Sequence, residues 1–451
     1  MFDRQTLQIG GKAEEEACHL LKPYREHIFL SHAESANRCL NFQIYQEKAQ
    51  IRKGDQNAVT RNVYDQEGEN MKKLLAVLLA VLMVLTLAGC GGKEEPAPAP
   101  EEVDLTGKPL RILQFVSQSL GSLSCEDLVY EGIKKFCDET GSTVETFELN
   151  NDDSRIAAQL TELCGSGKYD VVITGYWNLE EYVEQAGLEF PNVKFMAFDC
   201  TIDFDTYPEL KKNVSSYLCK QNTLAFAAGA LGGLMTESGL GLTNEDKVLG
   251  FVGGGHVTAI DDFLIGYIQG AHYVDPEIAV KYAYVGNWQD TALAKELAMD
   301  QYNAGADIVF GVCAPASFGV CDAAYTAQKY AFGVDTDHSG QLAISHPEQA
   351  EYTVSSAVKQ FGYAIYDGLK TIYDGTVVWG VNNSFDFDTG YLEMLETDVF
   401  NKTVKEGMPE VYAQYQEIVA KLLKGEIPVG TAVGATQDYI DAELAKAEPA
   451  Q

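Results

Sequence analysis

The sequence predicts an α/β fold made of two doubly wound, mostly parallel sheets. Short apolar runs rich in β-branched residues alternate with stretches whose apolar residues recur at helical spacing, which is the pattern of strand-helix-strand units. The alternation occurs in two successive series, each of the size of one ordinary domain. Residues 1–107 lack this alternation. We therefore expect two lobes that follow a separate N-terminal part.

Residues 71–89 have the three parts of a bacterial secretory signal. Lys72 and Lys73 begin it, an uncharged apolar run follows, and small residues precede Cys90. The run is shorter than the roughly 20 residues that a membrane-spanning helix needs. The ending Leu-Ala-Gly-Cys resembles the lipobox of bacterial lipoproteins, which implies lipidation at Cys90 and a lipid-anchored protein on the extracytoplasmic face of the cell membrane. A buried apolar helix and a true signal anchor are the alternatives.

Residues 1–70 show no clear periodicity and end directly before Met71. The codons of Glu67-Gly68-Glu69 are purine-rich, as at a ribosome-binding site. We expect Met71 to be the true start and residues 1–70 to be a mis-translated leader, with a genuine cytoplasmic extension as the alternative. Residues 90–107 are rich in Pro, Ala and Glu, and we expect them to form a flexible tether.

The acidic charge belongs to the part after the signal. Residues 1–89 hold 11 basic and 11 acidic residues, which leaves 22 of the 33 basic and 55 of the 66 acidic residues for residues 90–451. The whole net charge of −33 therefore lies there. Such a surface argues against binding nucleic acid, which rewards basic faces, and it leaves a small ligand open.

We expect the first lobe to comprise residues 108–220 plus 351–375. Helical patterns separate its strands, and residues 352–375 are expected to add one further strand and helix. The predicted strands are 111–116, 143–149, 170–175, 193–199 and 213–218.

We expect the second lobe to comprise residues 221–350 plus 376–440, with a last helix at 411–425. Its predicted strands are 247–254, 279–286, 307–312, 329–335 and 341–345.

The cysteines do not form a disulfide framework. Seven follow the tether region, an odd number without a CxxC pair. We interpret them as mostly buried thiols that pack like small apolar residues.

The residues directly after the strands are the candidates for binding, because ligands of open α/β sheets bind at the carboxyl ends of the strands. These loops are aromatic and polar. Aromatic side chains facing a cleft beside carboxylates suit a flat ring that bears hydroxyl or NH groups. Each residue also has a structural alternative: a tryptophan caps a core, an aspartate caps a helix, and a histidine bonds within its loop. The candidates are Tyr176, Trp177, Asp199, His256, Trp288 and Asp335.

Motifs for catalysis and metal binding are absent from the sequence. There is no GxSxG, HExxH or P-loop, and GFVGGGHVTA lacks the third glycine of the dinucleotide pattern. The stretch from Asp335 starts like a calcium loop, but His346 stands where a bidentate glutamate is needed. We therefore predict no enzyme, no metal and no cofactor.

From about Leu110 to Phe361 the chain resembles the basic membrane protein family of lipoproteins, the nucleoside-type solute-binding components of ABC transporters. The family order of the motifs is kept, which makes the resemblance specific. It implies a type I periplasmic-binding-protein fold whose two lobes close around a ligand at a hinge. The motifs are YEGIKKF (130–136), FVGGG (251–255), YVGNWQDTALAKELA (284–298), NAGADIVF (303–310) and GVDTD (333–337).

The resemblance implies roles for four positions. Asp199 and Asp335 match acidic residues that grip the ribose in nucleoside-binding members, and Lys359 matches a lysine of the cleft. Trp288 occupies the position of a phenylalanine in the family motif. A carboxylate that accepts two sugar hydroxyls and a ring that stacks are suited to this ligand.

The chain departs from the family where the base is recognised. The first loop reads GSLSCE (121–126), so Ser122 and Glu126 replace other groups, and His256 replaces an acid. A glycine-rich loop becomes residues 314–318. Phe318, Tyr176 and Trp177 are candidates for the missing stacking surface.

The leading hypothesis is a lipid-anchored, monomeric binding protein that passes a nucleoside-like molecule to an ABC permease and its ATPase, without nucleic acid as a partner. A sensing surface lipoprotein with the same cleft is the main alternative. A sugar-responsive transcription regulator shares the fold but needs a basic DNA-binding head, and an enzyme would have to turn over its nucleoside.

Overall fold

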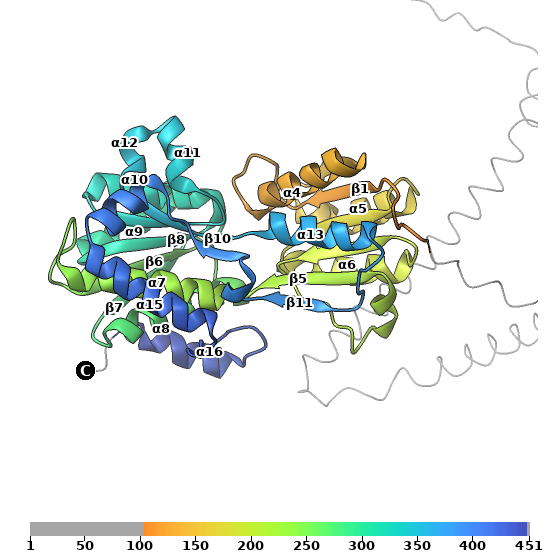
Figure 1. Cartoon of the computed structure of the whole chain (residues 1–451). Helices are drawn as coiled ribbons and strands as arrows, with labels where there is room; N and C mark the ends of the chain where they lie inside the picture. Colours follow the sequence, from red (N-terminus) through yellow and green to blue (C-terminus); the bar gives the residue numbers. More distant parts are fainter. Residues whose placement is uncertain (1–102, 449–451) are drawn as a thin grey trace, which may run out of the picture. The chain divides into compact units, whose positions relative to one another are not determined.

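The computed structural model describes residues 103–448. The predicted leader (1–70), the signal (71–89), Cys90 and most of the tether (90–107) lie outside these residues. The described chain forms two lobes, each with a six-stranded sheet between helices (Figure 1). The predicted α/β fold with two parallel sheets is confirmed. Within residues 103–448, no helix combines the length and apolar character needed to cross a membrane.

The first lobe has an all-parallel sheet in the order β11-β5-β4-β3-β1-β2. Strands β3 and β4 are buried along their whole length, as expected of parallel strands with helices on both faces. The strands are β1 (Arg111–Val116), β2 (Thr143–Glu148), β3 (Val171–Gly175), β4 (Lys194–Phe198), β5 (Val214–Cys219) and β11 (Asn382–Phe385). Its helices are α4 (Cys125–Thr140), α5 (Ile156–Gly165), α6 (Glu180–Glu189) and α13 (Phe361–Tyr373), with short 3₁₀ turns at Asp153–Arg155, Trp177–Leu179 and Pro208–Lys212.

The second lobe repeats this arrangement in the order β12-β10-β9-β8-β6-β7, with β12 antiparallel to β10. Its strands are β6 (Val248–Gly253), β7 (Ala279–Tyr284), β8 (Ala306–Val312), β9 (Tyr330–Val334), β10 (Thr353–Lys359) and β12 (Leu392–Met394). Its helices are α7 (Gln221–Ser238), α8 (Thr258–Val274), α9 (Thr291–Asn303), α10 (Ser317–Ala327), α11 (His338–Ser345), α12 (Pro347–Ala350), α14 (Asp398–Phe400), α15 (Pro409–Leu423) and α16 (Gln437–Leu444).

The chain passes between the lobes three times, at residues 219–221, 359–361 and 385–392. The predicted lobe boundaries are wrong here. Strand β10, within the segment 351–375 assigned to the first lobe, pairs with β9 in the second sheet, and only α13 joins the first lobe. Strand β11, within the segment 376–440 assigned to the second lobe, pairs with β5 in the first. A strand's apolar pattern shows that it is buried, but not which of two similar sheets it joins.

One predicted strand is a helix. Residues 341–345 lie in α11, because the Asp337 side chain accepts a hydrogen bond from the Gly340 backbone N–H (2.9 Å) and so caps a helix that begins at His338. The other predicted strands are present. The edge strands β11 and β12 have four and three residues, too few to give a periodic signal.

Close packing fixes α13 on the first lobe. A Cβ atom on Gly132 of α4 would collide with the backbone of Gly362 in α13. The two helix backbones therefore touch, and glycine is required at the contact. This places the start of α13, which follows the second crossing, directly beside the helix that follows β1.

The seven cysteines of the described residues are free thiols, and all except Cys137 are buried. This confirms the interpretation of them as mostly buried thiols.

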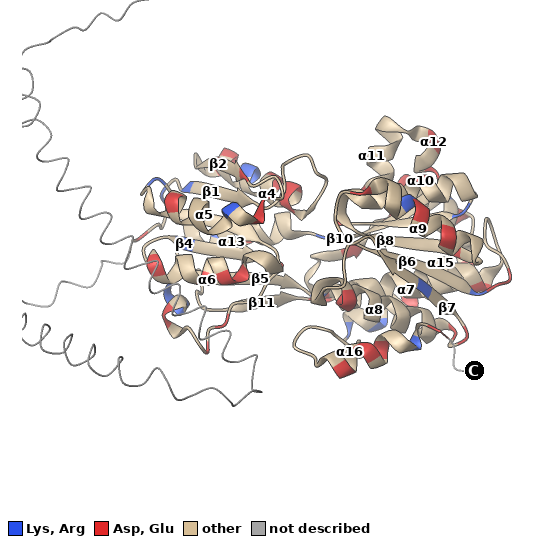
Figure 2. Cartoon of the chain, turned by 180° about the vertical axis from the view of Figure 1, so that it is seen from behind, with Lys and Arg blue, Asp and Glu red and all other residues tan. Residues whose placement is uncertain are grey.

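Acidic residues lie on helices of both lobes (Figure 2). Helices α6 and α16 are examples, with Glu180 and Glu181 in the first turn of one and Asp438 in the first turn of the other. Acidic residues therefore occur in both lobes of the described chain.

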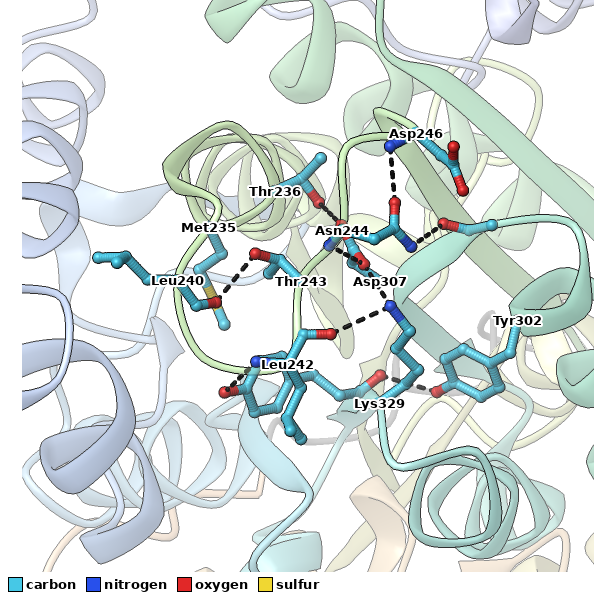
Figure 3. Close-up of polar contacts among 12 residues, drawn as sticks. Met235, Thr236, Leu240, Leu242, Thr243, Asn244, Asp246, Tyr302, Asp307 and Lys329 are labelled. Carbon is cyan, nitrogen blue, oxygen red and sulfur yellow. Dashed lines mark hydrogen bonds and ion pairs between the residues drawn. The ribbon is translucent and has the colours of Figure 1, made fainter.

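A cluster of polar contacts lies at the amino end of β8 in the second lobe (Figure 3). This is the end of the strand opposite the cavity-facing carboxyl end. The Asp307 carboxylate, at the start of β8, accepts hydrogen bonds from Lys329 Nζ (2.7 Å), the Asn244 backbone N–H (2.9 Å) and Thr236 Oγ1 (3.2 Å). Burial raises the pKa of Asp307, and these donors offset part of the rise. The carboxylate thus ties α7, the loop before β6 and the segment before β9 to one strand.

We expect Asp307→Asn to lower the free energy of unfolding by about 2–3 kcal/mol, because it leaves the Lys329 ammonium poorly paired. Urea unfolding measures this change. Asp246→Asn, at an exposed position nearby, is the control and should shift it by less than about 0.5 kcal/mol. Equal stability of both variants would contradict the structural role of Asp307.

Candidate functional site

A cavity of about 260 Å³ lies between the lobes at the carboxyl ends of their strands. This volume is slightly below the range of about 300–1,000 Å³ common for small-molecule pockets. The first lobe contributes mostly polar groups, and the second contributes mostly apolar ones. The lining residues are Ser117, Gln118, Asn151, Asp153, Tyr176, Trp177, Asn178 and Asp199 from the first lobe, and Gln221, Ala259, Ile260, Phe263, Trp288, Val312, Ala314, Val334, Asp335 and Lys359 from the second.

Six of the ten predicted site residues line this cavity. The structure therefore brings together side chains that lie up to 183 positions apart in the chain, from Tyr176 to Lys359. The six are Tyr176, Trp177, Asp199, Trp288, Asp335 and Lys359.

The backbone turns into the cavity in the same way at several strand ends. Tyr176, Asp199, Ala314 and Asp335 follow β3, β4, β8 and β9 and have φ angles of 75°, 56°, 50° and 64°. This left-handed region is uncommon for residues with a side chain. Neighbouring strands hold it in place: the Asp199 N–H donates to the Tyr217 carbonyl and the Asp335 N–H donates to the Ala357 carbonyl, both at 2.9 Å. The two aspartates thus occupy matching positions in the two lobes.

A buried ion pair joins the lobes at the cavity. Lys359 Nζ, from the end of β10, lies 2.7 Å from Asp199 Oδ2, and the two side chains are 4% and 8% exposed. The ammonium also donates to Gln221 Oε1 (3.3 Å). Burial lowers the pKa of Lys359, but the negative charges of Asp199 and Asp335 outweigh this effect and raise it. The lysine is therefore charged at neutral pH.

Asp335 also lines the cavity, and we call the part formed by Asp199, Asp335 and Lys359 its floor. Burial raises the pKa of its carboxyl, the Lys359 ammonium and a hydrogen bond from the Cys125 thiol lower it, and Asp199 raises it again. Cys125 belongs to the first lobe and Asp335 to the second. A further contact between the lobes lies next to it, where Thr336 Oγ1 donates to the Leu123 carbonyl (3.2 Å).

The Trp288 ring lines the cavity and packs against Gly254. A Cβ atom on Gly254, directly after β6, would overlap the six-membered ring of the Trp288 indole. Glycine at this position therefore lets the ring approach the backbone closely. Trp177 stands on the other lobe with 50% of its surface exposed, so its ring is available to a ligand.

Glu126 does not line the cavity, although the sequence predicts that it binds the ligand. Its buried carboxylate accepts the backbone N–H groups of Ser117 (2.6 Å) and Gln118 (3.1 Å). A carboxylate in the first turn of a helix satisfies the nearest unpaired N–H groups, which here belong to the loop after β1. Glu126 thus fixes the loop that supplies Ser117 and Gln118 to the cavity.

Three other predicted residues also lie outside the lining. His256 Nδ1 is 2.8 Å from Asp261 Oδ1, so this side chain contacts the first turn of α8. The Phe318 ring stacks on the buried His338, with 4.4 Å between ring centroids. Ser122 Oγ donates to Ser124 Oγ (3.1 Å) at the start of α4.

Several lining residues were not predicted. Gln221 and Asn151 follow β5 and β2, and the strand-end rule would have found them if it had been applied to those two strands. Ala259, Ile260 and Phe263 lie in the first two turns of α8, and no sequence signal shows which face of that helix meets the cavity.

The lining provides hydrogen-bond acceptors, one ammonium and aromatic faces. Among residues 103–448, no group of three His, Cys, Asp or Glu side chains is placed to hold a metal ion. The carboxylates and aromatic rings of the lining are suited to accepting hydrogen bonds from a ligand and to stacking on a flat ring.

We expect Gly254→Ala to push the Trp288 ring out of place and to lower the free energy of unfolding by about 1–3 kcal/mol. Thermal unfolding and the tryptophan emission spectrum report the two effects. Gly255→Ala is the matched control, because a Cβ there would meet no atom within 4 Å. An unchanged spectrum in the Gly254 variant would contradict this packing.

Glu126 gives a pH dependence of stability. Burial raises the pKa of its carboxyl from the ordinary 4.5 to about 7, so the folded state holds a proton that the unfolded chain releases. The stabilisation is present below pH 4.5 and is lost as pH rises through 7. Between pH 4.5 and 8, wild type should lose roughly 3 kcal/mol more than Glu126→Gln. Urea unfolding at each pH tests this, and parallel profiles would count against it.

The family model described as ABC transporter substrate-binding protein, PnrA-like (Bmp), matches residues 110–429. An uncharacterized lipoprotein of Pyrococcus abyssi is 24% identical over 318 residues, which cover 69% of this chain and 74% of the relative. The ABC transporter nucleoside-binding protein BmpA of Lactococcus lactis is 22% identical over 377 residues, which cover 79% of this chain and 99% of the relative.

Solved structures show the same fold. A solute-binding protein of an ABC transporter system from Aeropyrum pernix K1 aligns with a TM-score of 0.65 at 20% identity, over 75% of this chain and 98% of that one. A second such protein, from Conexibacter woesei, aligns with a TM-score of 0.56 at 16% identity, over 72% and 99%. The expected periplasmic-binding-protein fold is confirmed. Because the family match spans most of the chain, the protein belongs to the PnrA-like family of ABC-transporter substrate-binding proteins, whose members bind ligands and catalyse no reaction.

Proposed function

We propose that the protein captures a nucleoside or a similar ring-bearing small molecule and delivers it to the permease of an ABC importer, which a separate ATPase drives. One observation carries the proposal: the cavity presents carboxylates and aromatic rings from both lobes. Sugar hydroxyls donate to the carboxylates of Asp199 and Asp335, and a flat ring stacks on Trp177 or Trp288. The name of the nucleoside-binding relative from L. lactis supports the ligand class.

Capture proceeds by closure of the lobes around the ligand. The three crossings are the hinge, and residues at the ends of the elements take up the change in backbone angles. A ligand that contacts both lobes favours the closed arrangement by its extra contacts there. The Asp199 and Lys359 pair already spans the lobes, so the ligand adds to an existing polar bridge.

The protein acts as a lipid-anchored monomer on the extracytoplasmic face of the cell membrane. Cys90 carries the lipid, and residues 71–89 are removed as a signal. Two observations support this part of the proposal: the lipobox-like ending of the signal segment and the name of the P. abyssi relative, a lipoprotein.

The experiment is a thermal-shift screen with nucleosides, bases, flavins, sugars and amino acids. A ligand that binds only the folded state stabilises it by RT ln(1 + L/Kd), where L is the ligand concentration, so the melting temperature rises with ligand concentration and affinity. We expect at least one nucleoside-type ring compound to do so. If none of the ring compounds raises the melting temperature, the proposed ligand class is wrong.

Trp177→Ala should weaken the compound found in this screen about tenfold, because a stacked aromatic pair contributes about 0.5–1.5 kcal/mol beyond its buried area. The exposed ring should leave the melting temperature without ligand unchanged. Tyr363→Ala, which removes a ring that is 58% exposed and outside the cavity lining, is the control. Titration calorimetry measures both affinities, and equal affinities would remove Trp177 from the site.

A further inference from the structure

The charges of the cavity do not balance. Three carboxylates lie in the described lining, those of Asp153, Asp199 and Asp335, against the single ammonium of Lys359. That ammonium is already engaged with Asp199 Oδ2 at 2.7 Å and Gln221 Oε1 at 3.3 Å. The lining therefore has an excess of negative charge that its own residues do not neutralise.

The unpaired atoms in the cavity are acceptors. Asp199 Oδ1 and Gln118 Oε1 are buried without a hydrogen-bond partner. Their residues both line the cavity, and the Asp199 side chain is 92% buried. A buried acceptor without a donor costs free energy. A ligand stabilises this site when it brings donors or positive charge to these oxygens.

Of the two carboxylates in the floor, Asp335 has the weaker hydrogen-bond donor and the weaker counter-charge. The thiol that donates to it is a weak donor, and it shares the Lys359 charge with Asp199. Burial and the neighbouring Asp199 raise its pKa beyond what these two partners offset. A positive charge placed beside Asp335 would remove this imbalance.

Aromatic faces surround the same space. Trp177, Trp288, Tyr176 and Phe263 line it, and Lys359 Nζ already lies 5.4 Å from the centroid of the Phe263 ring. The faces of such rings attract cations, most strongly where water is excluded. Carboxylates and aromatic faces together favour a flat cation.

The helix end at the cavity does not reverse this preference. The first turn of α8 reaches the lining through Ala259 and Ile260, and a helix N-terminus favours anions. The N–H groups of Ile260 and Asp261 are bonded to the Val257 carbonyl at 2.9 Å. The same turn also carries the Asp261 carboxylate, so its field is already offset.

We propose that the ligand of this cavity carries a positive charge on its ring, and that Asp335 selects for this charge. The inference rests on the proposed function, because it refines the ligand of the same site. The class comprises nucleosides and related compounds with a quaternary or protonated ring nitrogen, such as pyridinium, thiazolium and methylated purine rings. Phosphorylated and carboxylated ring compounds are excluded, because they bring further negative charge to the carboxylates.

Two matched pairs of probes test the effect of the ring's charge. Nicotinamide riboside has a permanent cation, its dihydro form has the same heavy atoms with one added hydride on the ring and no charge, and nicotinamide mononucleotide adds a phosphate. A second pair is 7-methylguanosine and guanosine, compared at pH 6, where the methylated base is cationic. Calorimetry with the full-length protein in detergent should show at least tenfold tighter binding of the charged member in at least one pair. The mononucleotide should bind at least a hundredfold more weakly than its riboside.

Variants assign the preference to a residue. Asp335→Asn should bring the ratio of dissociation constants in the selective pair close to one, whereas Asp335→Glu should keep most of it. Asp300→Asn, which removes an exposed carboxylate outside the lining, is the control and should change the ratio less than twofold. Melting temperatures show which variants fold, and if Asp335→Asn does not, the comparison of Asp335→Glu with wild type still tests the residue.

The outcomes separate the two proposals. If neutral nucleosides bind and neither pair shows a preference for charge, the inference is wrong and the proposed function stands. If the preference is present but survives in Asp335→Asn, Asp335 is not the selecting residue. If no ring compound binds at all, the proposed function fails, and the inference fails with it.

Discussion

The rest of the site depends on one buried ammonium that serves both lobes. Lys359 extends from the last residue of a strand in the second lobe, and its partner Asp199 follows a strand in the first. A charge taken out of water requires a close counter-charge and further hydrogen bonds, and here they come from a different sheet. Neither lobe provides this environment by itself. The floor of the cavity is therefore formed by both lobes together, and the Asp199–Lys359 ion pair joins its two halves.

The lobes reach this arrangement by the same local geometry. At the ends of β4 and β9 an aspartate adopts a left-handed backbone, and its N–H is bonded to the neighbouring strand. Such conformations cost of order 1–3 kcal/mol and persist where surrounding structure determines them. The repetition at equivalent places in both sheets indicates that the geometry serves to aim side chains at the space between the lobes. Ala314 has the same left-handed conformation. Its side chain is only a methyl group, so this turn brings no polar group to the cavity.

The fold was predictable because parallel strands covered on both faces appear as uninterrupted apolar runs, as in β3 and β4. The strand-end rule also placed Asp199, Trp177 and Asp335 at one edge, because that rule follows from topology alone. Sheet membership was not predictable for β10, since burial is the same in either lobe. Glu126 was misassigned because the competition between a ligand and a loop N–H for its carboxylate is decided by positions within a few ångströms. The contribution of α8 depends on how a helix rotates about its axis, which its broad apolar surface does not determine.

The positions of the three crossings bear on which groups of the cavity stay in place. Lys359 is the last residue before one crossing, and Gln221 is the first helical residue after another, so both lie next to the hinge that we propose. Groups beside a hinge axis have a short lever arm and move little when the lobes turn. In the closure proposed above, the charged residues beside the crossings would therefore move little while the rest of each lobe turns. The proposed ligand would then meet its charged partners in nearly their final positions.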